Sequence, residues 1–137
     1  MKAILLVTSL FIGFSISTKF HFQAKLICNL EFDGHEAYHY SVSHWDRDWL
    51  SADDLIDQPK IGRANGDVVV FSDGYQSDDG ASFMNFEVYS YIKHNCTDNG
   101  EQRLLKIDLG KVRVALSDAT LKYDAVLSNN GTKVGEN

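Results

Sequence analysis

The sequence predicts an all-β domain, and three observations support that fold class. Apolar and polar residues alternate with a period of two over several segments, as they do when a strand buries one face. Turn-forming pairs such as Asp33-Gly34 and Asn65-Gly66 separate these segments. Outside the N-terminal run, almost no segment has the period of an amphipathic helix. Six or seven short strands with regular turn signals predict an antiparallel β-sandwich.

The first half of the chain is expected to hold three strands. Even-numbered residues share an apolar face over 20–30, and the same parity marks a second strand over 38–45. Residues 46–60, with several aspartates and the only proline, are expected to form a loop with one helical turn at 53–56. Asn65-Gly66 predicts a hairpin that leads into a strand at 68–71, because both turn residues tolerate positive φ.

The second half is expected to complete the sheets. Residues 73–82 are polar and contain glycine, so they predict a connection rather than a strand. Alternation then predicts a long strand over 83–95, another around 105–109 and a last one over 119–127.

The N-terminus has the parts of a secretory signal peptide. Lys2 is followed by an apolar run over residues 3–14, and the small residues Ser15 and Ser17 come next. The run is shorter than the roughly 20 apolar residues that cross a bilayer, so we do not expect a transmembrane protein. We expect residues 1–17 to be removed and the protein to be secreted, extracellular, with association to the cell surface left open.

The remaining chain is expected to be one domain, residues 18–128, followed by a flexible tail, residues 129–137. Without Lys2, the 13 basic residues fall to 12 against 19 acidic ones, which gives a formal charge of −7. This charge argues against a nucleic-acid partner, and against attraction to an anionic membrane by charge alone.

Cys28 and Cys96 are the only cysteines. In an exported chain, an even pair most simply forms one disulfide. Such a bond would close a loop of roughly 70 residues and contribute about 4 kcal/mol on the chain-entropy model. Metal binding by two lone cysteines is the weaker interpretation.

A further pattern runs from Lys25 to Leu127. Its parts are 25–29 with Gly34, Ala37, Val42 and Trp45-Asp46; 53–57 with 65–68; and 92–96 with 122–124. In order and spacing, this set resembles the nematode transthyretin-like family of secreted domains. The resemblance implies a seven-stranded, transthyretin-like sandwich, secretion, and no catalytic activity common to the family.

Histidines offer a possible metal site, which the spacing disfavours. His35 and His39 have the parity of one strand face, whereas His44 has the opposite parity, where the transthyretin-like pattern usually has an apolar residue. Ligands on two faces of a strand cannot converge on one zinc ion at about 2.0–2.1 Å. We expect ordinary surface and edge histidines here, and a hydrogen-bonded core histidine at His94 beside the disulfide.

The acidic loop is a candidate for weak calcium binding, because aspartate oxygens are ligands that calcium takes. Its spacing fits no EF-hand, since Ser51 stands where that loop needs glycine, so we expect a solvated loop with little or no calcium affinity. The candidate residues are Asp46, Asp48, Asp53, Asp54 and Asp57.

Aromatic residues and asparagines supply the other candidates. Tyr89 and Tyr91 share a strand face, while Trp45 and Trp49 flank the acidic loop; such residues are favoured interface anchors, and half-buried packing is an equal alternative. Asn95 and Asn130 each begin a glycosylation acceptor sequence, and Asn130 is favoured because its tail is expected to be flexible while the disulfide crowds Asn95.

These features predict a non-enzymatic extracellular binding or signalling domain without a cofactor, whose partner is an unknown extracellular protein, lipid or cell surface. Alternatives are calcium-dependent surface recognition, a carrier of small hydrophobic ligands as transthyretin is, and an enzyme like the hydroxyisourate hydrolases of the same fold. The last is least favoured. Residues 25–29 lack the histidine of that enzyme family, and residues 131–137 lack its Tyr-Arg-Gly-Ser-type ending.

Overall fold

The structure, a computed structural model, describes residues 17–31, 37–48, 51–77, 85–113 and 118–135. These residues form strands joined by turns, and none of them is helical, which confirms the all-β class. The expected signal peptide lies almost wholly outside them. In chain order the strands are β1 (Ser17–Ile27), β2 (Tyr38–Asp46), β3 (Asp54–Leu55), β4 (Lys60–Ala64), β5 (Val68–Ser77), β6 (Asn85–His94), β7 (Arg103–Arg113), β8 (Ala119–Val126) and β9 (Thr132–Lys133).

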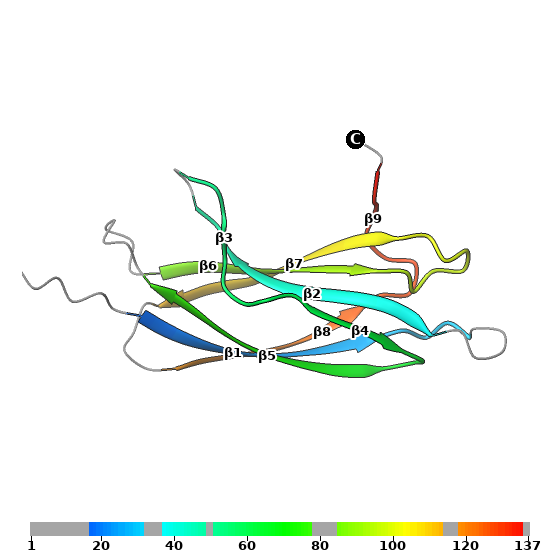
Figure 1. The fold of residues 1–137 in the computed structure, drawn as a ribbon, viewed down its shortest axis with the longest axis horizontal. Helices are drawn as coiled ribbons and strands as arrows, with labels where there is room; N and C mark the ends of the chain where they lie inside the picture. Colours follow the sequence, from blue (N-terminus) through cyan, green and yellow to red (C-terminus); the bar gives the residue numbers. More distant parts are fainter. Residues whose placement is uncertain (1–16, 32–36, 49–50, 78–84, 114–117, 136–137) are drawn as a thin grey trace, which may run out of the picture.

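Two sheets lie face to face (Figure 1). The smaller has the order β5-β1-β8, and the larger has the order β3-β2-β6-β7-β9 with β4 also paired to β2. Every pairing is antiparallel except that of β1 with β8, which is parallel. The expectation of a purely antiparallel sandwich is therefore wrong at this pair. Parallel neighbours need a long crossover, and here the intervening strands supply it.

The core lies between the sheets. Phe20, Phe22, Ala24 and Leu26 of β1 are at most 2% exposed, which confirms the alternation read from the sequence. At one end Leu26 packs with residues of both sheets and with the disulfide, and at the other Phe20 and Phe22 pack against Phe86. Burying each such side chain stabilises the fold by about 1.5–3 kcal/mol.

The acidic segment after β2 contains a strand where a helical turn was expected. Residues 54–55 form β3 and pair with Trp45 and Asp46, so the helical prediction is wrong. The backbone NH of Ile56 donates to the carbonyl of His44 at 2.8 Å, which holds this segment extended along β2.

Asn65-Gly66 does form a turn, with Gly66 at φ 85°, but not a hairpin. The turn joins β4, which pairs with β2, to β5, which pairs with β1. The chain thus changes sheets here. Local turn chemistry marks a reversal but does not say which neighbour each strand will take.

β5 continues to Ser77 through part of the segment expected to be a connection; residues 78–84 lie outside the described part. Gly74 makes this possible. A Cβ at this position would collide with the carbonyl group of Ile56, and the next residue, Tyr75, donates its backbone NH to that carbonyl at 3.2 Å.

The segment expected to be a flexible tail contains β9. Thr132 and Lys133 pair with Leu104 and Arg103 of β7, and the NH of Asn129 donates to the carbonyl of Cys96 at 3.0 Å. The described chain has nine strands rather than seven, and the two-residue strands β3 and β9 account for the difference. β6, β7 and β8 confirm the last three strands expected from alternation.

Candidate functional site

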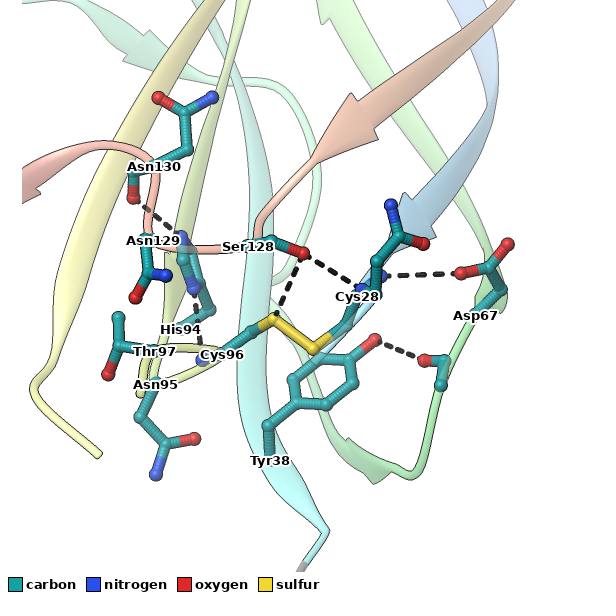
Figure 2. Close-up of a disulfide and its surroundings, with 12 residues drawn as sticks. Cys28, Tyr38, Asp67, His94, Asn95, Cys96, Thr97, Ser128, Asn129 and Asn130 are labelled. Carbon is teal, nitrogen blue, oxygen red and sulfur yellow. Dashed lines mark hydrogen bonds between the residues drawn. A yellow bond between two sulfur atoms is a disulfide. The ribbon is translucent and has the colours of Figure 1, made fainter. Parts of the chain in front are cut away.

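The disulfide joins the two sheets at one end of the molecule (Figure 2). Cys28 follows β1, Cys96 follows β6, and their Cα atoms are 6.1 Å apart. Both residues are buried, at 3% and 0% exposed. The backbone NH of Cys28 donates to Asp67 at 3.3 Å, so the turn before β5 is fixed to the same point. The predicted disulfide is confirmed.

The acidic residues do not share a centre. Asp57 turns inward and is 3% exposed, while Asp54 is exposed and accepts a hydrogen bond from Gln76 at 3.1 Å. Asp46 accepts from the backbone NH of Glu87 at 2.8 Å, and burial raises its pKa to about 6. Within the described ranges, no three histidine, cysteine or acidic side chains are grouped as a metal site requires.

A buried polar network surrounds His44, a residue expected at the surface or an edge. Asp57 accepts from the His44 backbone NH and from Nδ1, both at 2.7 Å, while Nε2 lies 2.9 Å from the Tyr123 hydroxyl. Tyr123 donates to Ser90 at 2.8 Å. His44 is 1% exposed, and the ring of Phe22 stacks on it at 3.6 Å between centroids.

This network explains why a histidine is tolerated in the core. Burying an unpaired polar group costs about 1–3 kcal/mol, and each polar atom of His44 has a partner. Phe22 covers one face of the imidazole, and the hydrogen bonds fix its orientation in the core.

The outer face of the larger sheet carries the predicted aromatic residues. Trp45 pairs across strands with Tyr89, and the rings of Tyr89 and Tyr91 meet edge to face at 5.1 Å. Trp45 and Tyr91 are partly exposed, whereas Tyr89 is 2% exposed. Lys106 of β7 covers Tyr89, with Nζ 3.8 Å from the ring centroid. We call Trp45, Tyr89, Tyr91 and Lys106 the aromatic face.

The acidic loop completes this face from the side. Tyr89 donates its hydroxyl to Asp53 at 2.6 Å, and this bond lowers the pKa of Asp53. Asp53 also accepts from the backbone NH of Asp48 at 3.1 Å. The structure thus brings Asp53 together with Tyr89 and Tyr91. The sequence had marked the acidic loop and the tyrosine pair separately and did not indicate that they meet. Tyr89 is 2% exposed beneath Lys106, so it is a buried packing residue rather than an exposed interface anchor.

Among the described residues, the most exposed aromatic side chains lie elsewhere, on edge strand β5. Val69, Phe71 and Tyr75 point outward from the smaller sheet and are 42%, 67% and 62% exposed. We call them the β5 stripe. A hollow of about 200 Å³ is lined by Phe71 with Ser72, Asp73 and, from β4, Lys60. Sequence reasoning missed this surface, although apolar residues of both parities over 68–71 signal a strand with two apolar faces.

Beside the stripe, His21 bridges two carboxylates. Its Nδ1 lies 2.6 Å from Asp73 of β5, and its Nε2 lies 3.2 Å from Asp118, just before β8. These hydrogen bonds, the one to Asp118 first, raise the pKa of His21. The three strands of the smaller sheet are thus connected on their outer face.

The remaining candidates, which are histidines and Trp49, have different outcomes. His94 is 2% exposed and donates from Nε2 to the Asn130 carbonyl at 3.1 Å, which confirms a hydrogen-bonded core histidine; burial lowers its pKa. His39 is exposed. Trp49 and His35 lie outside the described residues.

Comparison with known proteins identifies related sequences. A family model described as "Caenorhabditis elegans protein of unknown function (DUF870)" matches residues 23–136. Protein lin-61 of Caenorhabditis elegans is 31% identical over 107 residues, which cover 75% of this chain and 16% of that protein. The chain therefore spans about a sixth of this relative's length. Both matches agree with a nematode family, the coarser part of the resemblance. Across the segments that the structure describes, no helix has the length and apolar character to span a membrane.

Proposed function

This chain belongs to that family of Caenorhabditis elegans proteins, and we propose that it is a secreted, non-enzymatic binding domain of the transthyretin-like type that contacts an extracellular protein through the β5 stripe. The finer assignment to a transthyretin-like sandwich is supported by two facing sheets with seven strands of five or more residues. It is supported also by the ordered motifs between Lys25 and Leu127.

Export is supported by the N-terminus and by the disulfide. β1 begins at Ser17, so removal of residues 1–17 would leave its buried residues Thr18 and Phe20 in place. Disulfides persist in oxidising compartments and are rare in the cytosol, and the Cys28–Cys96 bond joins the two sheets.

Binding is supported by the exposure of the β5 stripe, the single observation on which the proposal depends. Val69 and Phe71 are neighbours on one face of β5, and Asp73 separates them from Tyr75. Exposed apolar residues that lie together mark interaction sites more often than single ones do. Among the described residues, β5 pairs as a strand only with β1. Its other edge contacts the segment after β3, where the Tyr75 NH donates to the Ile56 carbonyl, but no strand pairs with it. An extended peptide could add to that edge, with main-chain hydrogen bonds for affinity and side-chain contacts at Phe71 for specificity.

The non-enzymatic proposal is supported by the placement of the acid–base groups. His44 and Asp57 are 1% and 3% exposed, and His94 is held between the Cys96 backbone and the Asn130 carbonyl. A general base must lie within hydrogen-bond reach of the substrate proton, and none of these groups does so in a site open to solvent.

Two measurements test the proposal. The full chain, expressed in insect cells, should appear in the medium with an N-terminus at residue 18; retention inside the cells with Met1 intact would contradict export. Cross-linking of the oxidised protein to nematode extracellular fluid should then capture a partner that Phe71→Ser loses. Ile61→Ser is the matched control because Ile61, on β4, is an 80% exposed apolar residue outside the stripe. Equal capture by both variants would refute the role of the stripe.

A further inference from the structure

We propose that Asn130 carries an N-linked oligosaccharide and that Asn95 does not, because the closed disulfide and the folded turn hide the Asn95 acceptor sequence. This inference rests on the proposed export. Both asparagines begin an Asn-x-Thr sequence, so the acceptor motif itself does not distinguish them. Modification requires access to the asparagine amide and to the threonine hydroxyl two residues later.

The Asn95 sequence is enclosed. Cys96 is 0% exposed and committed to the disulfide, and Thr97 is 2% exposed with its hydroxyl donating to the Glu101 carbonyl at 3.1 Å. The side-chain oxygen of Asn95 accepts from the backbone NH of His39 at 2.6 Å. The third residue of this acceptor sequence is therefore inaccessible once the fold has formed.

The Asn130 sequence is open. Asn130 and Thr132 are exposed, and Gly131 between them has a φ of 94° in the turn before β9. The Thr132 hydroxyl donates to the Leu104 carbonyl at 3.3 Å, but Thr132 lies at the surface whereas Thr97 is buried. The Asn130 carbonyl accepts from His94, which fixes the backbone, while the side chain points away from the disulfide (Figure 2). The backbone is held, and the side chain is exposed while its Oδ1 accepts from the Gly131 NH at 2.8 Å.

The modification is compatible with the contacts already made. The donor is an oligosaccharide on a lipid pyrophosphate: a bond forms between Nδ2 and sugar C1, the C1–oxygen bond breaks, and the lipid pyrophosphate leaves with the electron pair. Nδ2 loses one proton to a base of the transferase and keeps the other. The remaining N–H can still donate to the Val126 carbonyl, which Nδ2 contacts at 2.9 Å.

A glycan at Asn130 would lie at the β8 edge of the smaller sheet. Asn130 is bonded to Val126 at the end of β8, and in the order β5-β1-β8 this strand lies opposite β5. A glycan here covers the end of the β8 edge, where Val126 is 49% exposed, and leaves the β5 stripe open. Bulky groups on an edge strand oppose edge-to-edge association.

The test uses the full chain in insect cells, with immunoblots of medium and cells before and after peptide N-glycosidase treatment. We expect one glycan on the secreted protein. Asn130→Gln and Thr132→Ala should each abolish it, and Asn95→Gln should leave it unchanged. A secreted protein without a glycan, or with its glycan at Asn95, would overturn the proposal.

A second arm tests the cause. Cys28→Ser keeps the Asn95-Cys96-Thr97 sequence but removes the disulfide, so a second glycan should appear and should be lost in Cys28→Ser with Asn95→Gln. If no second glycan appears, the disulfide is not what prevents modification of Asn95. A form with an established leader before residue 18 separates the two proposals. If only this form is exported, the native signal peptide is refuted. The glycan on the exported form still shows whether Asn130 or Asn95 is modified.

Discussion

Removing the carboxylate of Asp57 should destabilise the protein far more than removing that of Asp54, three residues earlier. Asp57 accepts two hydrogen bonds of 2.7 Å from His44, and both residues are buried. Asp57→Ala leaves the His44 NH and Nδ1 without this partner. Each unsatisfied buried group costs about 1–3 kcal/mol, and breaking a buried pair costs about 3–5 kcal/mol. We expect a loss of about 3–5 kcal/mol. Asp54→Ala, which removes an exposed carboxylate, should cost less than about 0.5 kcal/mol.

Urea unfolding at pH 7, followed by circular dichroism, measures both variants. Asp57→Asn should fall between them, because its amide oxygen can still accept from the His44 backbone. A cycle with His44→Ala and the double variant should give a coupling energy of about 1–3 kcal/mol. If Asp57→Ala costs no more than Asp54→Ala, or if the two sites are additive, the buried pair does not hold β2 to the acidic segment and the reasoning fails.

Three other perturbations should have measurable effects. Reduction of the Cys28–Cys96 bond should lower the free energy of unfolding by about 4 kcal/mol. Urea titrations with and without dithiothreitol measure this difference. A loss below about 1 kcal/mol would contradict the loop-closure argument. The pKa of His21 is raised, so its contribution to stability is complete below the ordinary value of 6.5 and disappears as pH rises through the folded-state value. An NMR titration of His21 should show that Asp118→Asn lowers this pKa. An unchanged titration midpoint would refute the bridge. Asp46 has the same sign. Its pKa is raised from 3.8 to about 6, so stability should fall by about 1–3 kcal/mol as pH rises between these values. Asp46→Asn, which can still accept from the backbone, should abolish that fall in urea titrations at several pH values.

Much of the fold could be predicted because a period of two is a local property. The alternation from Phe20 to Leu26 identified β1 and its buried face, and the same rule located β6 and β8. It could not assign partners. Asn65-Gly66 marks a turn with the same local chemistry whether the chain returns to the same sheet or crosses to the other one.

The candidate site was predicted less well, for a physical reason. Alternation indicates which face of a strand is apolar but not whether another sheet covers it. Phe71 and Tyr75 remain exposed because β5 is an edge strand whose outer face is uncovered by the described residues. Similarly, His44 follows the buried parity of β2, but its acceptance in the core depends on Asp57, which reaches it through a segment that was expected to be a loop.

The parallel pairing of β1 with β8 also controls when the protein can fold. Phe20 is opposite Ala119, so the inner strand of the smaller sheet lacks one neighbour until the ribosome has synthesised nearly all of the domain. Contacts between residues so far apart in sequence have a high entropic cost, and proteins dominated by them fold in milliseconds to seconds rather than microseconds. During synthesis β1 can pair with β5, but its other edge stays open. The nascent chain is therefore most prone to aggregation just before β8 emerges, and protection by chaperones matters most at that stage.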